Sequence, residues 1–270
     1  MKKILCFASV LIALMACANI DGTGKNDTSL KKDSITDSIS LREGKHDITA
    51  MVKIVVPVGN EALNKGVCDF IMNAIRYNDS TKITVIAPDV KSLAQSMLDS
   101  ISSMLKGATF YEGEESSGPP LWHNVEASIL DETAKTITIG IMQDIYLGGP
   151  HGSALVEGAT FNKADGKRLD ASIFAQDKLT DIKKEVTEGL KEFFGPLGNE
   201  EDSPLKDENG KDKIVELPEK GIYINKDSVV FIYQQYEIAP YAYGIPSTAL
   251  SLKDMKKKGL LEPEFAKNVE

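Results

Sequence analysis

Val125-Glu126-Ala127-Ser128-Ile129 and Ile137-Thr138-Ile139-Gly140-Ile141 are the two stretches that decide the fold of this chain. In both, apolar side chains recur at every second position, which is the period of a strand with one buried face. Asp131-Glu132-Thr133-Ala134 lies between them and has the composition of a turn. The sequence therefore predicts a β-hairpin here, its strongest strand signal.

Before this hairpin the apolar period is mainly helical. A buried strand over 51–58 is followed by a helix whose apolar face carries Leu63, Val67, Phe70, Ile71 and Ala74. Residues 83–86 are a candidate short strand. Asp89 is expected to cap a second helix that ends at Lys106 before Gly107. A loop is expected over 111–120.

After the hairpin, a strand is predicted over 155–162 and an amphipathic helix over 176–194. An acidic loop over 198–213 precedes a second hairpin over 221–234, and its second strand is apolar on both faces, as a central strand would be. Helices and strands come in runs, so the predicted class is α+β. We expect an N-terminal helix/strand unit, followed by an antiparallel-sheet domain with one long amphipathic helix.

The N-terminus has the pattern of an export signal. The chain begins with Met1-Lys2-Lys3, an apolar run to Met15, and then Ala16-Cys17. The run is too short for a permanent membrane span and has the form of a signal peptide over 1–16. Leu14-Met15-Ala16-Cys17 resembles the lipobox of bacterial lipoproteins, in which Cys17 would be lipid-modified. The alternative is an ordinary secretory signal with a chance cysteine. In the lipoprotein interpretation, Cys6 leaves with the signal peptide and Cys17 carries lipid, so Cys68 is the remaining free cysteine, expected to be a small buried hydrophobe.

The expected mature chain divides into four parts. Residues 17–45 have few apolar side chains and are predicted to be a disordered tether. The N-terminal α/β unit is expected over 46–147 and the C-terminal α+β domain over 148–258, followed by a frayed tail over 259–270.

The expected mature chain is acidic. Removing Lys2 and Lys3 with the signal peptide leaves 29 basic residues against 40 acidic ones, a formal charge of −11. This acidic balance argues against nucleic acid as a partner.

Three blocks, taken in order, resemble a known family. They are Tyr146-Leu147-Gly148-Gly149-Pro150-His151-Gly152; Phe161-Asn162 with Gly166-Lys167, Leu169 and Ile173-Phe174; and Val230-Phe231-Ile232-Tyr233 with Tyr236-Glu237-Ile238-Ala239-Pro240-Tyr241-Ala242 and Gly244. The arrangement is similar to the extracellular domain pair of anti-sigma-V factors, also found in peptidoglycan deacetylase C and in Bacteroides-type lipoproteins. The resemblance covers about residues 46–256 and implies a C-terminal domain of unknown function.

The resemblance also implies binding outside the cytoplasm, because the anti-sigma-V sensor domain recognises lysozyme. The chain lacks the clustered metal-binding histidines of the deacetylase domain, and its histidines His46, His123 and His151 have no metal-site spacing. No G-x-S-x-G motif or phosphate-binding loop is present. We therefore expect no catalytic residues, metal or cofactor.

The candidate ligand-binding residues are Gly148, Gly149, His151, Tyr236, Tyr241 and Tyr243. Glycines around His151 permit close approach by a ligand, and tyrosines on an irregular loop are typical of interfaces and sugar-stacking sites. The alternatives are structural: His151 would close a tight turn, and the tyrosines would lock their loop onto the sheet. Trp122 could stack on a glycan.

The leading hypothesis is a non-enzymatic binding or sensing module, anchored to the membrane through lipid on Cys17. It would lie in the cell envelope, most simply at the outer membrane of a Gram-negative bacterium, facing the periplasm or the outside. Its partner would be an envelope protein, lysozyme-like, or a cell-wall glycan. The alternative is a cell-wall-modifying or hydrolytic enzyme with a site near His151.

Overall fold

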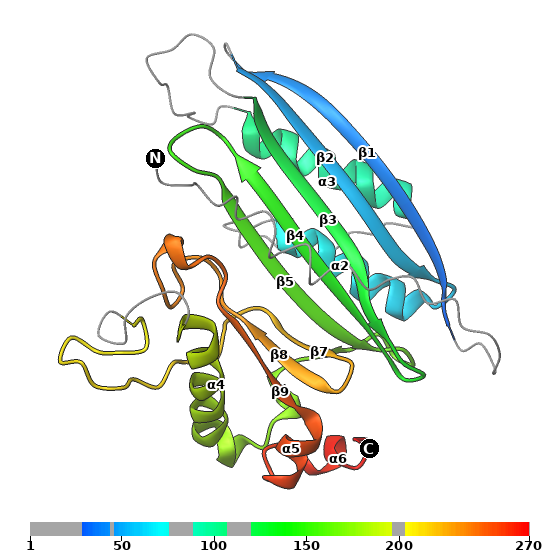
Figure 1. Cartoon of the computed structure of the whole chain (residues 1–270). Helices are drawn as coiled ribbons and strands as arrows, with labels where there is room; N and C mark the ends of the chain where they lie inside the picture. The colour runs from blue at the N-terminus through cyan, green and yellow to red at the C-terminus, as the bar shows by residue number, and fades with distance from the viewer. Residues whose placement is uncertain (1–28, 44–45, 76–88, 107–119, 196–202, 270) are drawn as a thin grey trace.

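The computed structural model describes residues 29–43, 46–75, 89–106, 120–195 and 203–269. Its larger unit is a six-stranded sheet in the order β1-β2-β3-β4-β5-β6 (Figure 1). Neighbouring strands are antiparallel except β2 and β3, which are parallel. The strands are β1 Lys31–Glu43, β2 His46–Val58, β3 Leu121–Glu132, β4 Thr136–Tyr146, β5 Ser153–Asn162 and β6 Arg168–Leu169.

Helices α2 (Glu61–Ile75) and α3 (Val90–Leu105) cover one face of this sheet. Alternate residues of β2, from Ile48 to Val56, point to that face and are at most 1 % exposed. The apolar face predicted for the first helix is buried against them, and α3 buries Val90, Leu93, Met97 and Ile101 in the same core. Met104, the last apolar position of the stripe predicted for the second helix, is 44 % exposed. Asp89 caps α3 as predicted, because its carboxylate accepts a hydrogen bond from the backbone N–H of Ser92 at 2.7 Å.

The hairpin predicted from the alternating apolar residues is confirmed as β3 and β4, which pair from Trp122 with Tyr146 to Glu132 with Ile137. Val125 and Ala127 on β3, and the isoleucines of β4 from Ile137 to Ile141, are buried on the helix-covered face. The period of two thus correctly identified both the strands and the face that they bury.

The predicted tether over 17–45 is wrong for residues 31–43, because these form β1. This strand pairs with β2 through 13 residue pairs along the edge of the sheet. Ile35, Ile39 and Leu41 point to one side and pack against the core, while the intervening serines and threonine remain exposed. The apolar positions are few because an edge strand with one half-buried face needs only a few. Residues 1–28, which include the predicted signal peptide, lie outside the described residues.

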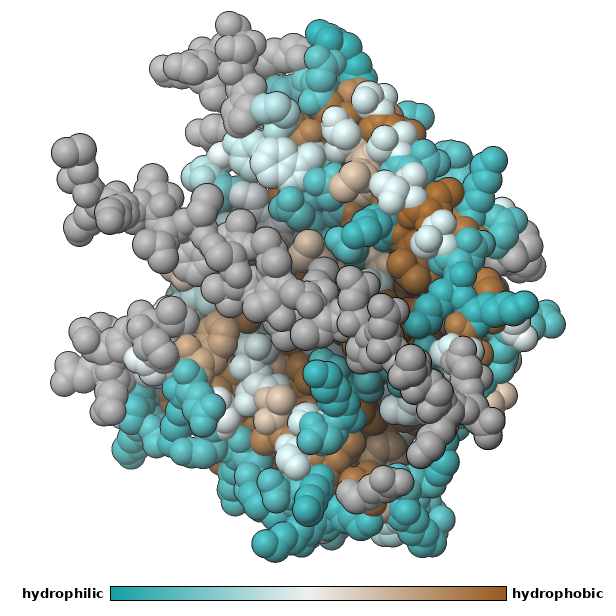
Figure 2. Space-filling model, turned by 45° about the vertical axis from the view of Figure 1, so that its right-hand side comes forward, coloured by the Kyte–Doolittle hydropathy of each residue, from teal (hydrophilic) through white to brown (hydrophobic). Residues whose placement is uncertain are grey.

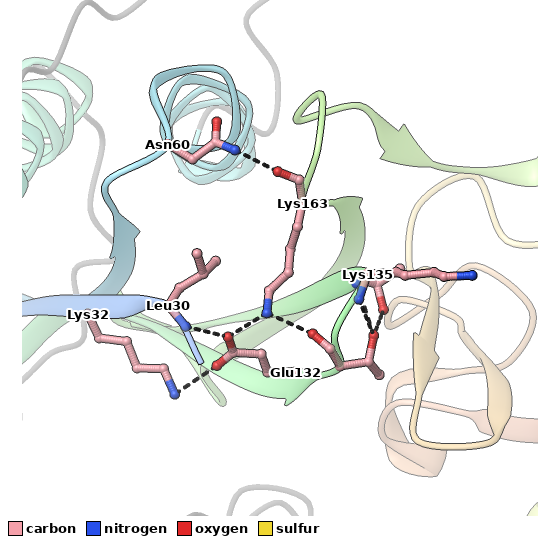
Figure 3. Close-up of polar contacts among 8 residues, drawn as sticks. Leu30, Lys32, Asn60, Glu132, Lys135 and Lys163 are labelled. Atoms are coloured by element: carbon pink, nitrogen blue, oxygen red, sulfur yellow. Dashed lines mark hydrogen bonds and ion pairs between the residues drawn. The ribbon is translucent and has the colours of Figure 1, made fainter. Parts of the chain in front are cut away.

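A polar network at Glu132 holds the start of β1 in place (Figure 3). The Glu132 carboxylate accepts a hydrogen bond from the Leu30 backbone N–H at 2.8 Å and lies 3.1 Å from the Lys32 ammonium. Its other ion pair, 2.7 Å long, is with Lys163 after β5, and the Lys163 ammonium also donates to the Thr133 carbonyl. Lys163 is only 8 % exposed, so the network supplies the charge partner that its burial demands.

The predicted boundary between the units, at residue 148, is also wrong. β5 pairs with β4 over ten residues, and β6 pairs with β5, so both strands complete the N-terminal sheet. The glycine-containing segment 147–152 is therefore a hairpin loop within one sheet. Glycines favour both hairpin loops and linkers, and their presence alone did not distinguish the two. The first unit ends near Leu169.

The second unit confirms an antiparallel sheet with one long helix. Its three-stranded sheet has the order β7-β8-β9, so β8 is the central strand, as predicted. Figure 2 shows the lower part of the molecule, where this unit lies, with hydrophilic residues around its outline and hydrophobic residues between them. The elements are short 3-10 turns at Ala171–Ile173 and Gln176–Lys178, α4 Leu179–Phe194, β7 Ile222–Asn225, β8 Ser228–Ile232, a 3-10 turn Tyr241–Tyr243, β9 Ser247–Ser251, α5 Leu252–Lys257 and α6 Pro263–Ala266.

The tail predicted to be frayed over 259–270 is ordered through 269. Leu260 and Leu261 are 3 % and 4 % exposed, and Leu261 forms a β-bridge with Phe174. Phe265 packs against the same core from α6. Two adjacent leucines supply enough apolar surface to dock this short segment, although it is too short to show a period.

The second unit packs through β7 against the sheet face opposite α2 and α3. Ile224 at the centre of β7 makes backbone hydrogen bonds to the Thr138 and Thr160 side chains, including Ile224 N–H to Thr160 Oγ1 at 2.7 Å. Gly158 on β5 leaves room for the Tyr223 ring, since an added Cβ would lie 2.2 Å from it. Burial raises the pKa of Tyr223 to about 12.

The remaining predictions fall partly outside the described residues: the strand over 83–86, Gly107, residues 111–119 of the loop over 111–120, and residues 198–202 of the loop over 198–213. Within the described part of the chain, none of the helices is both long and apolar enough to cross a bilayer.

Candidate functional site

Three loops from both units meet at one end of the large sheet (Figure 1). The first is the hairpin loop 147–152 between β4 and β5. The second is the turn 234–237 that follows β8, and the third is the 3-10 turn Tyr241–Tyr243. Their aromatic side chains form the candidate site.

His151, Tyr241 and Tyr236 lie against one another in this order, and we call them the aromatic platform. The rings of His151 and Tyr241 are stacked, with centroids 3.8 Å apart and planes 19° from parallel. The Tyr236 ring lies 6.1 Å from that of Tyr241, tilted by 31°. His151 and Tyr236 are exposed and Tyr241 is half-buried between them. The structure thus brings together three of the predicted residues.

Tyr236 combines two unusual properties. It is 65 % exposed, the largest value among the exposed large hydrophobic residues of the described chain. Its backbone has φ of +68°, a conformation that costs a bulky non-glycine residue of the order of 1 kcal/mol or more. An exposed ring recovers little of this cost by packing. Such strain is more common at functional sites than elsewhere.

The turn that carries Tyr236 is attached to the free edge of β5 by two glutamine side chains. Gln234 accepts a hydrogen bond from the Val156 N–H at 3.1 Å and donates to the Val156 carbonyl at 2.7 Å. Gln235 accepts from the Ala154 N–H at 3.2 Å. These amides replace a neighbouring strand at the β5 edge, so the Tyr236 turn is fixed relative to the loop that carries His151.

A carboxylate closes the same turn from inside. Glu237 accepts hydrogen bonds from the backbone N–H of Gln234 at 2.7 Å and from that of Glu219 at 3.2 Å. The Glu237 N–H in turn donates to the Gln234 carbonyl at 3.1 Å. Tyr236 therefore occupies the third position of a closed turn, where a positive φ is imposed by the turn geometry.

Glycines shape the His151 loop. Gly148 and Gly149 have φ of +91° and +93°, which any other residue would adopt only at a cost. The Tyr146 hydroxyl donates a hydrogen bond to the Gly149 carbonyl at 3.0 Å. His151 Nδ1 lies 2.8 Å from the Gly152 carbonyl. The structural role considered for His151, closing the turn, is therefore present beside its stacking on Tyr241.

Two other aromatic residues have structural contacts. Tyr243 does not join the platform, because its ring meets Phe194 edge-on at 5.4 Å in the core of the second unit. Trp122 lies on β3 at the same end of the sheet, with its ring 5.0 Å from that of Tyr146 and tilted by 34°, and its indole N–H donates to Asp144 at 2.8 Å. The locking role considered for the tyrosines applies to Tyr243, whereas Tyr236 and Tyr241 face outward.

The site shows no constellation for metal chemistry: across the described ranges, no three His, Cys, Asp or Glu side chains are grouped to hold a metal ion. His123 is buried and hydrogen-bonded to Gln143 at 3.0 Å, and burial lowers its pKa. Gln143 in turn donates to the Ala74 carbonyl at the end of α2, so this pair joins sheet to helix. Burial raises the pKa of the Cys68 thiol to about 11, which makes it unreactive at neutral pH.

One group of charged residues was missed by sequence reasoning. Glu157, Arg168 and Lys220 line a cavity beside α2, far from one another in the sequence. The only sequence signal was Glu157 itself, an acidic residue in an otherwise apolar strand.

Comparison with known proteins finds similar structures. Two crystal structures of DUF3298 family proteins resemble nearly the whole chain. One, from Bacteroides fragilis NCTC 9343, has a TM-score of 0.65 and 17% identity, covering 91% of this chain and 99% of its own. The other, from Pseudomonas aeruginosa PAO1, has a TM-score of 0.61 and 13% identity, covering 88% and 96%. At these identities the likeness shows a shared fold. No curated protein matches the chain.

The C-terminal domain of unknown function expected from the sequence is thus found, while its pairing as in anti-sigma-V factors and peptidoglycan deacetylase C stays a prediction. Residues 171–253, from the first 3-10 turn to the start of α5, match the family described as "Protein of unknown function (DUF3298)".

Proposed function

We propose that this protein is a lipid-anchored binding module of the cell envelope that recognises a protein or a cell-wall glycan through the aromatic platform. The observation that carries the proposal is Tyr236, an exposed aromatic residue held at a positive φ and aligned with Tyr241 and His151. The closed turn imposes the positive φ, but glycine would adopt it without strain, and the exposed ring of a tyrosine adds little packing in return. A ligand that covers the exposed rings would recover the energy.

The platform suits a partner with a flat, partly apolar face. Burying aromatic surface contributes about 25 cal/mol per Å², and rigid rings lose little conformational entropy on binding. The faces of a sugar ring and a side-chain patch on a protein both meet this description. The acidic balance of the chain, 31 basic against 40 acidic residues, favours a neutral or cationic partner, such as a lysozyme-like protein, over an anionic one.

The anchor rests on Cys17 alone. Acylation of this residue would tie the chain to a membrane, with the outer membrane of a Gram-negative bacterium as the simplest location. Because β1 begins at Lys31, any tether between Cys17 and the sheet is far shorter than the sequence suggested. Mass spectrometry of the mature protein should find diacylglycerol on Cys17, and a free thiol there would disprove the anchor.

The binding proposal is tested with purified mature protein, soluble peptidoglycan fragments and lysozyme. We expect saturable binding to one of them by calorimetry. Tyr241→Ala should weaken it at least tenfold, because the central ring of the platform is lost. His151→Ala should also weaken binding while leaving the melting temperature nearly unchanged. Ile214→Ala, which removes another exposed apolar side chain, serves as the matched control and should bind normally.

A second experiment addresses the enzymatic alternative. The wild-type protein and His151→Ala are incubated with peptidoglycan and with generic ester substrates, and products are followed by mass spectrometry. Turnover that disappears in His151→Ala would replace the binding proposal with a hydrolytic one. Failure of both ligands to bind, together with unchanged behaviour of both platform variants in a pull-down from envelope extract, would reject the platform as a binding site.

A further inference from the structure

A second concave site lies on the helix-covered side of β5. It is a cavity of about 320 Å³ between α2, the β5–β6 turn and the segment leading into β7. Phe70 and Phe161 form an apolar wall, with ring centroids 5.9 Å apart. Glu157, Arg168 and Lys220 supply the charges. Its volume is at the lower end of the range for small-molecule sites.

The cavity wall is built by close backbone contacts that only glycine permits. An added Cβ on Gly66 of α2 would lie 2.6 Å from the Gly166 carbonyl oxygen. One on Gly166, which has φ of +69°, would lie 2.3 Å from the Ala62 carbonyl oxygen. The turn after β5 is therefore pressed against α2, and the positions of Phe161 and Arg168 on either side of it are fixed.

The cavity holds two cationic side chains and one carboxylate. Glu157 is 7 % exposed, and its Oε1 forms an ion pair with the Lys220 ammonium nitrogen, 3.6 Å away. The Arg168 guanidinium lies over the Phe70 ring, 5.2 Å from its centroid. The two cations exceed the one carboxylate, and a carboxylate can accept more hydrogen bonds than one ion pair uses, so a ligand that brings both a carboxylate and an ammonium would be stabilised.

We propose that this cavity binds a small zwitterion of the α-amino acid class. The ligand ammonium would hydrogen-bond to Glu157, its carboxylate would lie between Arg168 and Lys220, and a small apolar side chain would contact Phe70 and Phe161. A simple carboxylate would satisfy the two cations but be repelled by Glu157. A simple amine would satisfy Glu157 but meet two positive charges. Only a ligand with both groups complements all three residues.

This inference does not depend on the aromatic platform. Glu157 points to the helix side of β5, whereas its neighbours Val156 and Gly158 contact the second unit. A platform variant such as Tyr241→Ala should therefore still bind an amino acid in the cavity. Either proposal can fail without affecting the other.

The test is calorimetric titration of the mature protein with glycine, L-alanine and D-alanine, beside acetate and ethylamine as single-charge probes. At least one amino acid should bind at least tenfold more tightly than both single-charge probes. Glu157→Gln should weaken it by roughly tenfold or more, as loss of a charged hydrogen bond does. Glu126→Gln is the matched control, because Glu126 makes a 2.9 Å ion pair with Lys53 outside the cavity.

Arg168→Met is a second variant, which should weaken amino-acid and acetate binding alike. Equal binding of acetate and alanine would show an anion site and overturn the zwitterion assignment. The five probes are used at about 10 mM, on the order of ten times a millimolar dissociation constant. If none of them gives binding heat or a shift in melting temperature, the cavity is not a binding site for this class of ligand.

Discussion

Tyr236 has a strained backbone conformation, although its exposed ring gains little from packing. Replacing it with glycine should leave the melting temperature unchanged or raise it, because glycine adopts φ of +68° without strain. The change should remain within about 1 kcal/mol. Binding of the platform ligand should nevertheless fall at least tenfold. Thermal unfolding and calorimetry on the same sample measure both effects.

Tyr236→Ala is the control, because it removes the ring without relieving the backbone. It should bind as weakly as Tyr236→Gly but be less stable than it. A drop of several degrees for Tyr236→Gly would show instead that the tyrosine ring stabilises the turn, and the functional interpretation of its strain would fail.

Glu157 makes a prediction about pH. Burial raises its pKa above the ordinary 4.5, although Lys220 and Arg168 oppose the shift. The folded chain therefore binds this proton more tightly than the unfolded chain, and the contribution of Glu157 to stability falls as pH rises through the raised pKa. Glu157→Gln should be more stable than wild type at pH 7, and this advantage should shrink below pH 4.5. Urea unfolding of both proteins at several pH values measures this advantage. A difference in the free energy of unfolding that does not change with pH would contradict the prediction.

At the scale of elements, the Glu132 network determines whether β1 stays attached. Partial burial would raise the pKa of Glu132, but hydrogen bonds from Lys163, the Leu30 N–H and Lys32 lower it below 4.5. Glu132→Ala should lower the free energy of unfolding by about 2–4 kcal/mol, since it leaves Lys163 buried without its carboxylate. Hydrogen exchange should show β1 losing protection first.

Asp47→Ala is the matched control for this prediction. It removes an ion pair to Arg42 of similar length, 2.9 Å, whose two side chains are 66% and 77% exposed, and should cost less than about 1 kcal/mol. In wild type, the stabilisation from Glu132 should be present above pH 4.5 and be lost as pH falls through its lowered pKa. Equal losses in both variants would show that burial of the network adds nothing.

Most elements could be predicted because their apolar residues repeat at short range. The isoleucines of β4, the stripe of α4 and the Asp89 cap each signal their structure within a few residues. β1 was missed because its exposed positions look like those of a polar linker. The platform residues were singled out individually, but the 3.8 Å stack of His151 on Tyr241 joins residues 90 positions apart, and no local pattern encodes it.

At the scale of the whole molecule, the contact of Gly158 with Tyr223 joins the two units. Gly158→Ala should destabilise the protein by about 1–3 kcal/mol, because the new methyl group would overlap the ring and force β7 away from β5. Calorimetry should show the unfolding transition becoming broader or dividing into two. Gly195→Ala is the control: an added Cβ there meets nothing within 4 Å, and its effect should be near zero. A single unfolding transition at the wild-type temperature for Gly158→Ala would indicate that the two units are held together mainly by another contact.

Lys31, the first residue of β1, pairs with Val58, whereas Trp122 and Tyr146 pair beside the loop that carries His151. The two places lie at opposite ends of strands 13 residues long, which is roughly 40 Å. A pull between the N-terminus and a partner held at the platform would therefore run along the strands. Such a load shears the β1–β2 hydrogen bonds together, whereas a pull across the strands would unzip them one at a time. The register makes the sheet mechanically strongest in the direction in which a tethered, ligand-bound protein would be stretched.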